Sequence, residues 1–503
     1  MGPTIAATVF GAVGVIAAFF LRPRFVDRAL AMRIAIFWLL TTPVMFLLPS
    51  QMAILIACAP LLVLLTPKNI DDRAAFYFAA LLAVPDAIAA AVPFPGLNYL
   101  VVLDFSMLAF LILLAPAFVI RPKPQAAKFA PTAGALLILM TILFSILEFR
   151  STNLTSGLRA GLEIFMLYAL PFMALIRLIR TRDDVEKIFS TLVFIALIFF
   201  FAALISQATR WNFYTYVTNR FGFSEFADFR HGLLRVAVTL NTVLAGFIMT
   251  LGLLSVEYYR AQRILGFAVA WMLRGMCITA AFFTYSRGAW LSMMVAFVTF
   301  WVFSRMPRAV RPAFVMITVF AGIPTALYSI MTGDLSSVDE FGSFEYRREL
   351  LRASFIQIGE HPLLGDPYFL QSGNFDHLVQ GQGIVDVVNY YIQIALKHGL
   401  LGLALFVGAF ASCIAGLLKI GERLIEGDQR VLELQRAVLL GACVGYLVLI
   451  GTTSSVSLVA HVGTALLAFS TAFVAAARAE KRPAGAALGA PLRPADASGD
   501  LYG

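Results

Sequence analysis

The composition of the chain predicts an all-α polytopic membrane protein. Of its 503 residues, 60% are hydrophobic and only 13% are charged, and the mean hydropathy is +0.86. Soluble domains are about 45–50% apolar and about 25% charged. Apolar runs of spanning length, about 20 residues each, recur along the chain, and we expect a bundle of about 12–15 transmembrane helices.

The expected spans divide the chain into six units. About fifteen apolar runs reach spanning length: 4–21, 33–48, 50–66, 74–93, 99–120, 129–147, 160–176, 188–206, 236–255, 264–284, 288–304, 312–331, 400–418, 437–453 and 457–477. The units are N-terminal transmembrane helices (1–206), a loop (207–235), transmembrane helices (236–331), a long loop (332–398), C-terminal transmembrane helices (399–477) and a tail (478–503). The tail, rich in Ala, Pro and Gly, is expected to be disordered.

The basic residues predict the orientation of these helices. If the N-terminus is outside, every second connection faces the cytoplasm, and those connections hold most of the 38 basic residues. The net charge of +9 then reports orientation rather than binding to nucleic acid. The outer side is left with Arg150, Arg159, Arg210, Arg220, Arg230, Arg235, Arg287, Arg347, Arg348 and Arg352, and with Lys397 as its lysine. Since arginine binds phosphate through two parallel hydrogen bonds, this pattern favours an anionic substrate, with snorkelling side chains as the alternative.

The sequence lacks the signatures of several classes of site. Its four cysteines lie inside apolar runs, so no disulfide framework is expected. It has no Walker loop, dinucleotide-binding glycine motif or zinc-type Cys/His spacing, so we expect no cofactor, no metal and no ATP site. The first apolar run has no basic segment before it, and we expect no cleavable signal peptide.

The long loop 332–398 is where we expect chemistry, because a bilayer tolerates polar, irregular chain only where it is sheltered or outside the lipid. Helical spacing predicts a surface helix over 346–358 that carries Arg348 and Arg352 one turn apart. Its apolar stripe consists of Leu350, Leu351, Phe355 and Ile358.

A second helix is predicted over 384–398, ended by Gly399. Asp386, Asn389 and Gln393 fall on one face of it, and a carboxylate there could accept a proton from a hydroxyl. The alternative is the ordinary polarity of a solvent-facing helix.

Two other connections add candidates. Arg287, in a Ser286-Arg287-Gly288 motif, lies at the outer junction of two spans, and it is either a functional residue or an interfacial anchor. In the connection 207–235, Arg210 and Arg235 are interleaved with aromatic residues, which suits a sugar phosphate. The alternative for that connection is an amphipathic loop on the membrane surface.

Four residues place charge inside expected spans, namely Asp86, Asp104, Glu163 and Arg274. Such charges are costly and are usually paired or functional. We expect Glu163 to be the partner of Arg274. A proton relay among these residues would favour a transporter.

Four motifs, taken in order, resemble those of the O-antigen ligase and polymerase superfamily. The members of this superfamily are bacterial inner-membrane glycosyltransferases of the GT-C class. The motifs are Ser286-Arg287-Gly288-Ala289-Trp290-Leu291, Tyr346-Arg347-x5-Ala353, Glu360-His361-Pro362-Leu363-Leu364-Gly365 and Asn389-x-Tyr391-Ile392-Gln393-x5-Gly399-Leu400-Leu401-Gly402. The resemblance covers residues 230–475; before residue 200 the chain matches only as generic membrane helices.

The resemblance implies metal-independent transfer on the periplasmic side, without a nucleotide sugar. The implied donor is a glycan on undecaprenyl diphosphate, the acceptor is a second saccharide, and the lipid bilayer and other polysaccharide-assembly proteins are implied partners. The chain would be a multi-pass inner-membrane protein with a periplasmic N-terminus and a cytoplasmic C-terminus. Two arginines that handle the diphosphate in the ligases correspond to Arg287 and Arg347, whose guanidinium groups could stabilise the leaving group.

One position departs from the ligases, which carry a histidine implicated in transfer where this chain has Val388. Valine cannot accept a proton, and Asp386 is the nearest candidate base. We therefore predict a polymerase of exopolysaccharide or O-antigen repeat units, with Asp386, Arg287 and Arg347 as catalytic residues. The predicted substrate contacts are Arg210, Arg235, Arg348, Asn389, Gln393 and His361. A ligase acting on lipid A core, a transporter of lipid-linked oligosaccharide and a non-catalytic export component remain the alternatives.

Overall fold

The computed structural model describes residues 2–96, 98–121, 128, 130–150, 152–221, 229–230, 232–307, 309–311, 343–379, 385–420, 426–454 and 458–480. Within these ranges the chain is almost entirely helical, and ten helices are long and apolar enough to cross a membrane. The all-α polytopic architecture is thereby confirmed. The expected span 312–331 and the tail after residue 480 lie outside the described residues.

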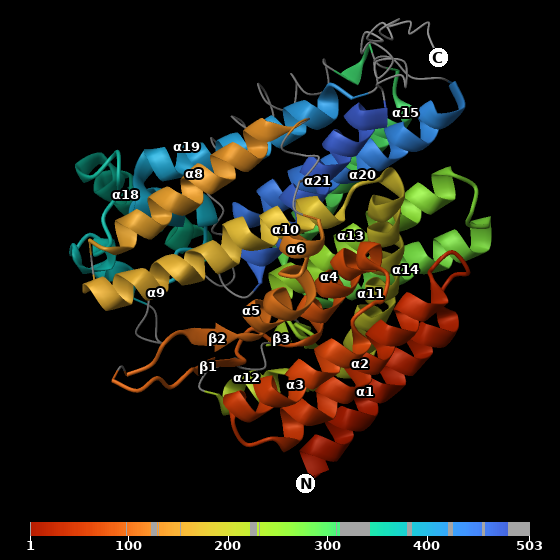
Figure 1. Cartoon of the computed structure of the whole chain (residues 1–503), viewed down its shortest axis with the longest axis horizontal. Coiled ribbons are helices and arrows are strands. Elements are labelled where there is room, and N and C mark those ends of the chain that lie inside the picture. Colours follow the sequence, from red (N-terminus) through yellow and green to blue (C-terminus); the bar gives the residue numbers. More distant parts are fainter. Residues whose placement is uncertain are drawn as a thin grey trace, which may run out of the picture.

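The N-terminal half supplies half of the long helices (Figure 1). Its helices are α1 (Gly2–Leu21), α2 (Arg28–Leu47), α3 (Gln51–Leu65), α4 (Arg73–Ala83), α5 (Phe105–Ala109), α6 (Ala117–Ile120), α8 (Pro131–Glu148), α9 (Leu154–Ile164), α10 (Leu170–Leu178), α11 (Arg182–Thr209) and α12 (Thr215–Arg220). A π-helical turn over Phe165–Ala169 joins α9 to α10, so that 154–178 forms one continuous span. Short antiparallel strands β1 (Ala89–Ala91) and β2 (Val102–Asp104) make a hairpin.

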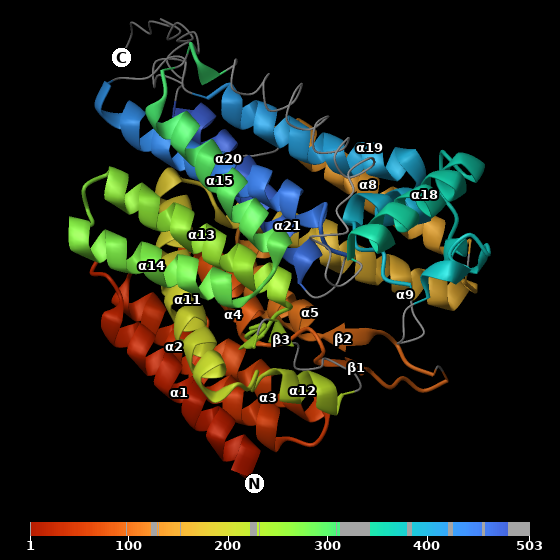
Figure 2. The same cartoon turned by 180° about the vertical axis from the view of Figure 1, so that it is seen from behind.

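The C-terminal half carries the segments with the family-like motifs. Its elements are strands β3 (Phe229–Arg230) and β4 (Leu233–Leu234), and helices α13 (Thr242–Ala261), α14 (Phe267–Phe283), α15 (Arg287–Arg305), α18 (Ser343–Glu360), α19 (Tyr390–Leu418), α20 (Glu426–Ile450) and α21 (Val459–Glu480). α13 and α21 lie at the centre of the bundle. In the most apolar stretch of each, 89% and 94% of the residues are buried, against 28% in α1. α15 packs along α20 and α8 packs along α19 (Figure 2).

Two expected spans are shorter than predicted. The run 74–93 forms only α4, because Pro85 cannot continue a helix and the chain then enters β1. The run 99–120 begins as β2 and becomes helical only at Phe105, after Asp104 has capped α5 through the backbone N–H of Met107. Together with α3 and α14, 105–120 is one of three apolar helices below full spanning length among the described residues.

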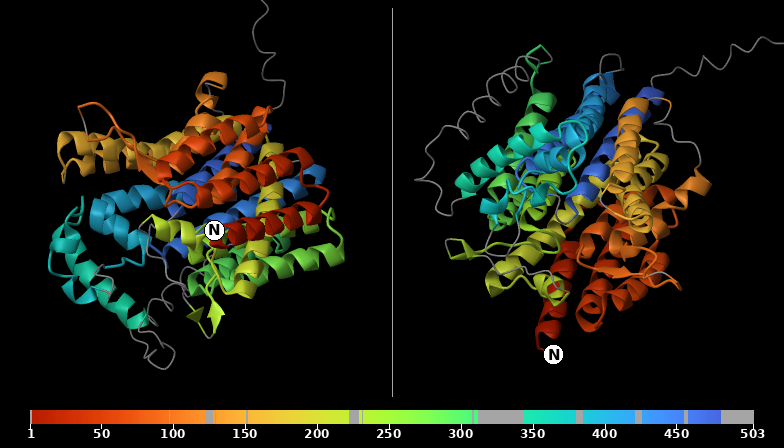
Figure 3. Two further views of the ribbon diagram at one scale, coloured as in Figure 1. Left: turned by 90° about the horizontal axis from the view of Figure 1, so that it is seen from below. Right: turned by 90° about the vertical axis from the view of Figure 1, so that its left-hand side faces the viewer.

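The predicted surface helix in the long loop is confirmed as α18, which lies at one end of the bundle beside α19 (Figure 3). We refer to this end as the α18 end; it is the end that the charge pattern predicts to be outside. α18 and the chain after it form a small second core with the start of α19. The buried members of this core are Leu350, Ala353, Phe369, Phe375, Leu378, Val387 and Leu396.

The buried face of α18 differs from the predicted stripe at one position. Phe355 is 62% exposed, whereas the amide side chain of Gln357 is buried. Gln357 donates to Asp366 Oδ2 at 3.1 Å and accepts from Asn374 at 2.9 Å. The core of the loop therefore contains a satisfied polar network, which the apolar pattern could not indicate.

Two glycines fasten the long loop to α19. Gly399 has φ 72° and ψ −178°, so the helix kinks there and continues, rather than ending as predicted. Gly365 also has a positive φ, of 67°. The backbones meet closely: Leu400 N–H donates to Pro362 at 2.8 Å and Asp366 N–H to Leu396 at 2.8 Å. A Cβ on either glycine would lie within 2.6 Å of the opposing backbone, so only glycine fits this contact.

Candidate active site

Three segments of the chain meet around Asp386 at the α18 end. They are α18, the extended residues 385–389 before α19, and the 451–454 turn that follows α20. The hydroxyl of Tyr346, on α18, binds the main chain of Asp386. It donates to the Asp386 carbonyl at 2.9 Å and accepts from the Asp386 N–H at 3.0 Å. The predicted helix over 384–398 is therefore wrong at its start, because these backbone groups bond to Tyr346 instead of to a helical neighbour.

The carboxylate of Asp386 is half-buried and has two polar neighbours. The hydroxyl of Ser454, which is 8% exposed, forms a hydrogen bond with it, and the guanidinium of Arg347 interacts with it electrostatically. Burial raises the pKa of Asp386, while Ser454 and Arg347 act in the opposite direction; burial prevails. A carboxylate with a raised pKa, beside a cation, is suited to accepting a proton.

Arg287 lies on the other side of the 451–454 turn. It is the first residue of α15, is exposed, and follows Ser286, whose hydroxyl accepts from the N–H of Ala289. Gly288 is in direct contact with Thr452, since a Cβ on Gly288 would lie 2.1 Å from Thr452 Oγ1. Thr452 is two residues before Ser454. The turn therefore links the start of α15, with Arg287, to the Asp386 carboxylate.

Two of the predicted substrate contacts, Arg348 and Asn389, have partners within the protein. Arg348 forms an ion pair with Glu345 of the same helix at 2.5 Å. The side chain of Asn389 caps α19 by accepting from the N–H of Ile392 at 3.2 Å. Gln393 lies in the first turn of α19 and is half-buried. Asp386 and Asn389 therefore do not share a helix face, contrary to the prediction.

The remaining predicted contacts lie in three other places. His361 is exposed in the turn after α18, where its carbonyl accepts from the N–H of Gly365. Arg210 ends α11 in a left-handed conformation and is exposed. Arg235 is half-buried and donates to Thr242 Oγ1 at 2.9 Å.

Several arginines that the charge pattern predicts to be on the outer side bind backbone carbonyls. Arg150 donates to Gly365 at 2.8 Å and to Lys397 at 3.0 Å, and so links α8 to the loop contact. Arg220 donates to Phe46 and Leu48 at the end of α2. Arg159 donates to Leu100. A guanidinium group can donate to two carbonyls at once. These contacts therefore explain, without a substrate, part of the preference for arginine over lysine on the predicted outer side.

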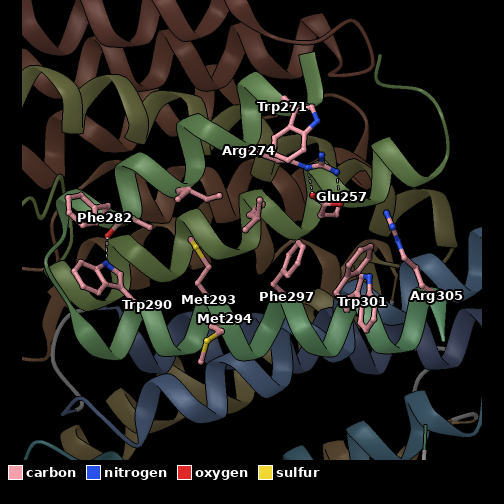
Figure 4. A pocket seen from close by; sticks show the side chains of 14 residues that line it. Glu257, Trp271, Arg274, Phe282, Trp290, Met293, Met294, Phe297, Trp301 and Arg305 are labelled. Atoms are coloured by element: carbon pink, nitrogen blue, oxygen red, sulfur yellow. Dashed lines mark hydrogen bonds and ion pairs between the residues drawn. The ribbon is translucent and has the colours of Figure 1, made fainter. Parts of the chain in front are cut away.

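An apolar groove runs from Trp290, three residues after Arg287, along α13, α14 and α15 (Figure 4). Its volume is about 570 Å³. Trp290 stands at one end, stacked on Phe282 and donating to the carbonyl of Ala281 at 2.8 Å; Arg305 stands at the other end. Most of the lining between them is apolar or aromatic, namely Leu253, Trp271, Ile278, Met293, Met294, Phe297, Phe300 and Trp301.

The charge of Arg274 is compensated inside this groove by Glu257, and the expected pairing with Glu163 is wrong. Arg274 binds Glu257 through Nε, and through Nη2 to Oε2 at 2.9 Å. Both side chains are largely buried, at 15% and 5% exposure. Sequence reasoning passed over Glu257 because it lies just beyond the expected span 236–255.

Sequence reasoning also missed Ser454 and Tyr346. The signal for Ser454 was present: the polar run Thr452-Thr453-Ser454-Ser455 separates two apolar helices at the predicted outer side. Tyr346 was noted only as part of a motif. No group of three or more His, Cys, Asp or Glu side chains that could hold a metal occurs among the residues whose positions are described.

Comparison with known families identifies this region. Residues 267–407 match the family model described as O-antigen ligase. The matched segment runs from α14 into α19 and includes Arg287, Arg347 and Asp386. No curated protein matches the chain. Over residues 267–407 the chain is thus similar to the O-antigen ligase family, which supports the resemblance to the O-antigen ligase and polymerase superfamily.

Proposed function

We propose that this protein polymerises undecaprenyl-diphosphate-linked oligosaccharide repeat units into exopolysaccharide or O-antigen, at the periplasmic face of the inner membrane. The family match supports a ligase- or polymerase-type function in polysaccharide assembly. Val388, in place of the histidine of the ligases, favours the polymerase. The observation that carries the proposal is the position of the Asp386 carboxylate between Ser454 and Arg347.

The proposed reaction uses the three candidate residues as follows. The acceptor hydroxyl oxygen attacks the anomeric carbon of the donor, and its proton passes to the Asp386 carboxylate. The bond between the anomeric carbon and the phosphate oxygen breaks, and undecaprenyl diphosphate leaves with the electron pair. Arg287 and Arg347 bind the diphosphate and stabilise the charge that develops on it. No nucleotide is needed, because the diphosphate is already an activated leaving group.

The groove supports a donor that carries a lipid. Its walls are apolar, its volume is about 570 Å³, and Trp290 at its end is three residues from Arg287. A polyprenyl chain in the groove would place its diphosphate at Arg287. Arg210, Arg235 and Arg348 are auxiliary anion contacts in this proposal.

The test is transfer by purified protein with a lipid-diphosphate oligosaccharide and no nucleotide. We expect growth of the glycan chain. Arg287→Ala, Arg347→Ala and Asp386→Asn should each slow it by about 100-fold or more, the typical cost of losing a transition-state contact or general base. Arg352→Ala, on the same helix but paired with Glu349, is the matched control and should keep near-normal rates.

The outcomes separate the alternatives. Transfer only to lipid A core would identify a ligase. Absence of any transfer, with normally folded protein, would contradict the proposal and favour a transporter or a non-catalytic export component.

A further inference from the structure

The direction of the Asp386 side chain depends on the non-helical conformation of residues 385–389. Val387 is a buried member of the small second core, and Val385 packs against that core. In a helix these two valines would lie about 200° apart and could not both face it. Because both do, the carboxylate between them points the other way, where it meets Ser454 and the charge of Arg347.

The hydrogen bonds of this segment are not those of a helix. The N–H groups of Val388 and Asn389 donate to the carbonyls two residues earlier, at 3.0 Å and 2.7 Å. Such bonds make tight three-residue turns. They hold the segment locally, but they do not attach it to any other part of the molecule.

The hydroxyl of Tyr346 makes that attachment. It accepts from the N–H of Asp386 at 3.0 Å and donates to the carbonyl of the same residue at 2.9 Å. A tyrosine hydroxyl can donate one proton and accept others, so one group serves both main-chain atoms. Among the described residues the N–H of Asp386 has no other acceptor.

The other neighbours of Asp386 do not act on its main chain. Ser454 forms a hydrogen bond with the carboxylate, and Arg347 acts through its charge. A carboxylate held only in this way could still follow its backbone into the first turn of α19. Tyr346 therefore fixes the point from which the side chain extends.

The ring and the hydroxyl of Tyr346 have separate contacts. The ring packs against the second core, to which α18 also contributes Leu350 and Ala353. The hydroxyl reaches beyond that core to Asp386. Loss of the hydroxyl alone should therefore leave α18, and with it Arg347, in place.

We infer that Tyr346 is a positioning residue for Asp386: its hydroxyl keeps residues 385–389 out of α19 and so directs the carboxylate to Ser454 and Arg347. This inference rests on the proposed function for the role of Asp386 as a base, but not for the position of its side chain. Tyr346 acts through Asp386 and does not touch the reacting atoms.

The first arm of the test needs no substrate. Hydrogen exchange of the full-length protein in detergent, read by mass spectrometry, should show faster exchange at Asp386 in Tyr346→Phe, by about tenfold, because the N–H loses its acceptor. The matched control is Tyr216→Phe on α12. Tyr216 is 41% exposed, its ring stacks on Phe46, and its hydroxyl makes no hydrogen bond among the described residues.

The second arm is the transfer assay. In Tyr346→Phe we expect kcat to fall by about tenfold or more, since a misplacement of about 1 Å can cost about 100-fold, and the KM for donor to stay unchanged. In the Asp386→Asn background the same substitution should change the residual rate by less than about twofold, because the two residues act as one unit. A merely structural role would lower the rate in both backgrounds.

The inference is overturned if exchange at Asp386 is the same in wild type and Tyr346→Phe. It is also overturned if exchange quickens while kcat is unchanged, or if Tyr346→Phe lowers the rate equally in both backgrounds. Faster exchange in Tyr346→Phe, in a protein without transfer activity, would leave the positioning of Asp386 standing and reject the proposed function.

Discussion

Asp386 illustrates how neighbouring groups set the chemistry of a single residue. Its backbone is held by Tyr346, its carboxylate by Ser454, and its charge is balanced by Arg347. Burial nevertheless prevails and raises its pKa. A base with a raised pKa is a better proton acceptor, and on the proposed function the transfer activity is then lost at a higher pH as the medium is acidified.

The first prediction concerns this pH dependence. Ser454→Ala removes a hydrogen bond that favours the charged carboxylate, so the pKa of Asp386 should rise further. The acid limb of the pH–rate profile should therefore move to higher pH, while the rate at alkaline pH changes little. Ser412→Ala, on the distant part of α19, is the control. An acid limb that stays in place in Ser454→Ala would show that Asp386 is not the titrating base.

A second residue-scale prediction concerns Arg274 and Glu257. Glu257→Gln leaves a buried guanidinium without its counter-charge, which typically costs about 3–5 kcal/mol. The double variant Arg274→Met with Glu257→Met removes both charges and should recover most of that stability. Thermal unfolding in detergent measures both. Equal melting temperatures for the single and double variants would mean that the pair does not stabilise the fold.

At the scale of elements, the contact between the long loop and α19 depends on Gly365 and Gly399. The φ and ψ of Gly399 lie in a region that is essentially restricted to glycine and costs another residue about 1–3 kcal/mol. A side chain there would also meet the backbone of Leu363. This explains why both glycines belong to the motifs that resemble the family: they join the loop that carries Arg347 to the helix that follows Asp386.

We predict that Gly399→Ala detaches this loop without unfolding the bundle. Transfer activity should fall at least as far as in Arg347→Ala, and trypsin should cleave within α18 faster than in wild type. Gly408→Ala is the matched control on the same helix, because a Cβ there would make an ordinary contact of 3.4 Å with Leu136. Normal activity and normal protease resistance in Gly399→Ala would contradict this role.

The elements also show what the sequence can and cannot predict. Periodicity placed α18 correctly, since its apolar spacing is a local property. It failed for 385–389, where the hydroxyl of Tyr346 takes the backbone groups of Asp386, forty residues away, that a helix would use. It failed for the partner of Arg274, because several acidic residues were available and only the packing of α13 against α14 selects Glu257.

On the scale of the whole molecule, two sites of opposite character lie at the α18 end. One holds Arg347 beside Asp386 and the start of α15, which leads into an apolar groove, and the other is an acidic cavity between α9, α19 and α21, lined by Asp86, Asp104 and Glu163. Composition alone predicted the membrane architecture and the resemblance predicted the motif residues. Neither predicted that Asp86, Asp104 and Glu163 come together, because they lie on three separate elements of the N-terminal half.

The groove yields a prediction at this scale. Met293→Trp should partly fill it and hinder a long prenyl chain more than a short one. We expect the KM for a long-chain donor to rise about tenfold, as for the loss of one to two kcal/mol of apolar contact, and the KM for a short-chain donor to stay unchanged. Leu204→Trp, at an exposed apolar position on α11, is the control. An equal effect on both donors would mean that the groove does not hold the lipid.

The groove is also open along its side. Trp271, Ile278, Phe282, Met294 and Trp301 all line it and remain more than 40% exposed. A ligand that enters through such a wall never passes through water, so its effective concentration is its mole fraction among the surrounding lipids. Diluting the donor with inert phospholipid should therefore slow the enzyme even when the amount of donor per volume of sample is constant. On the proposed function, the membrane is then the solvent in which this protein meets its donor.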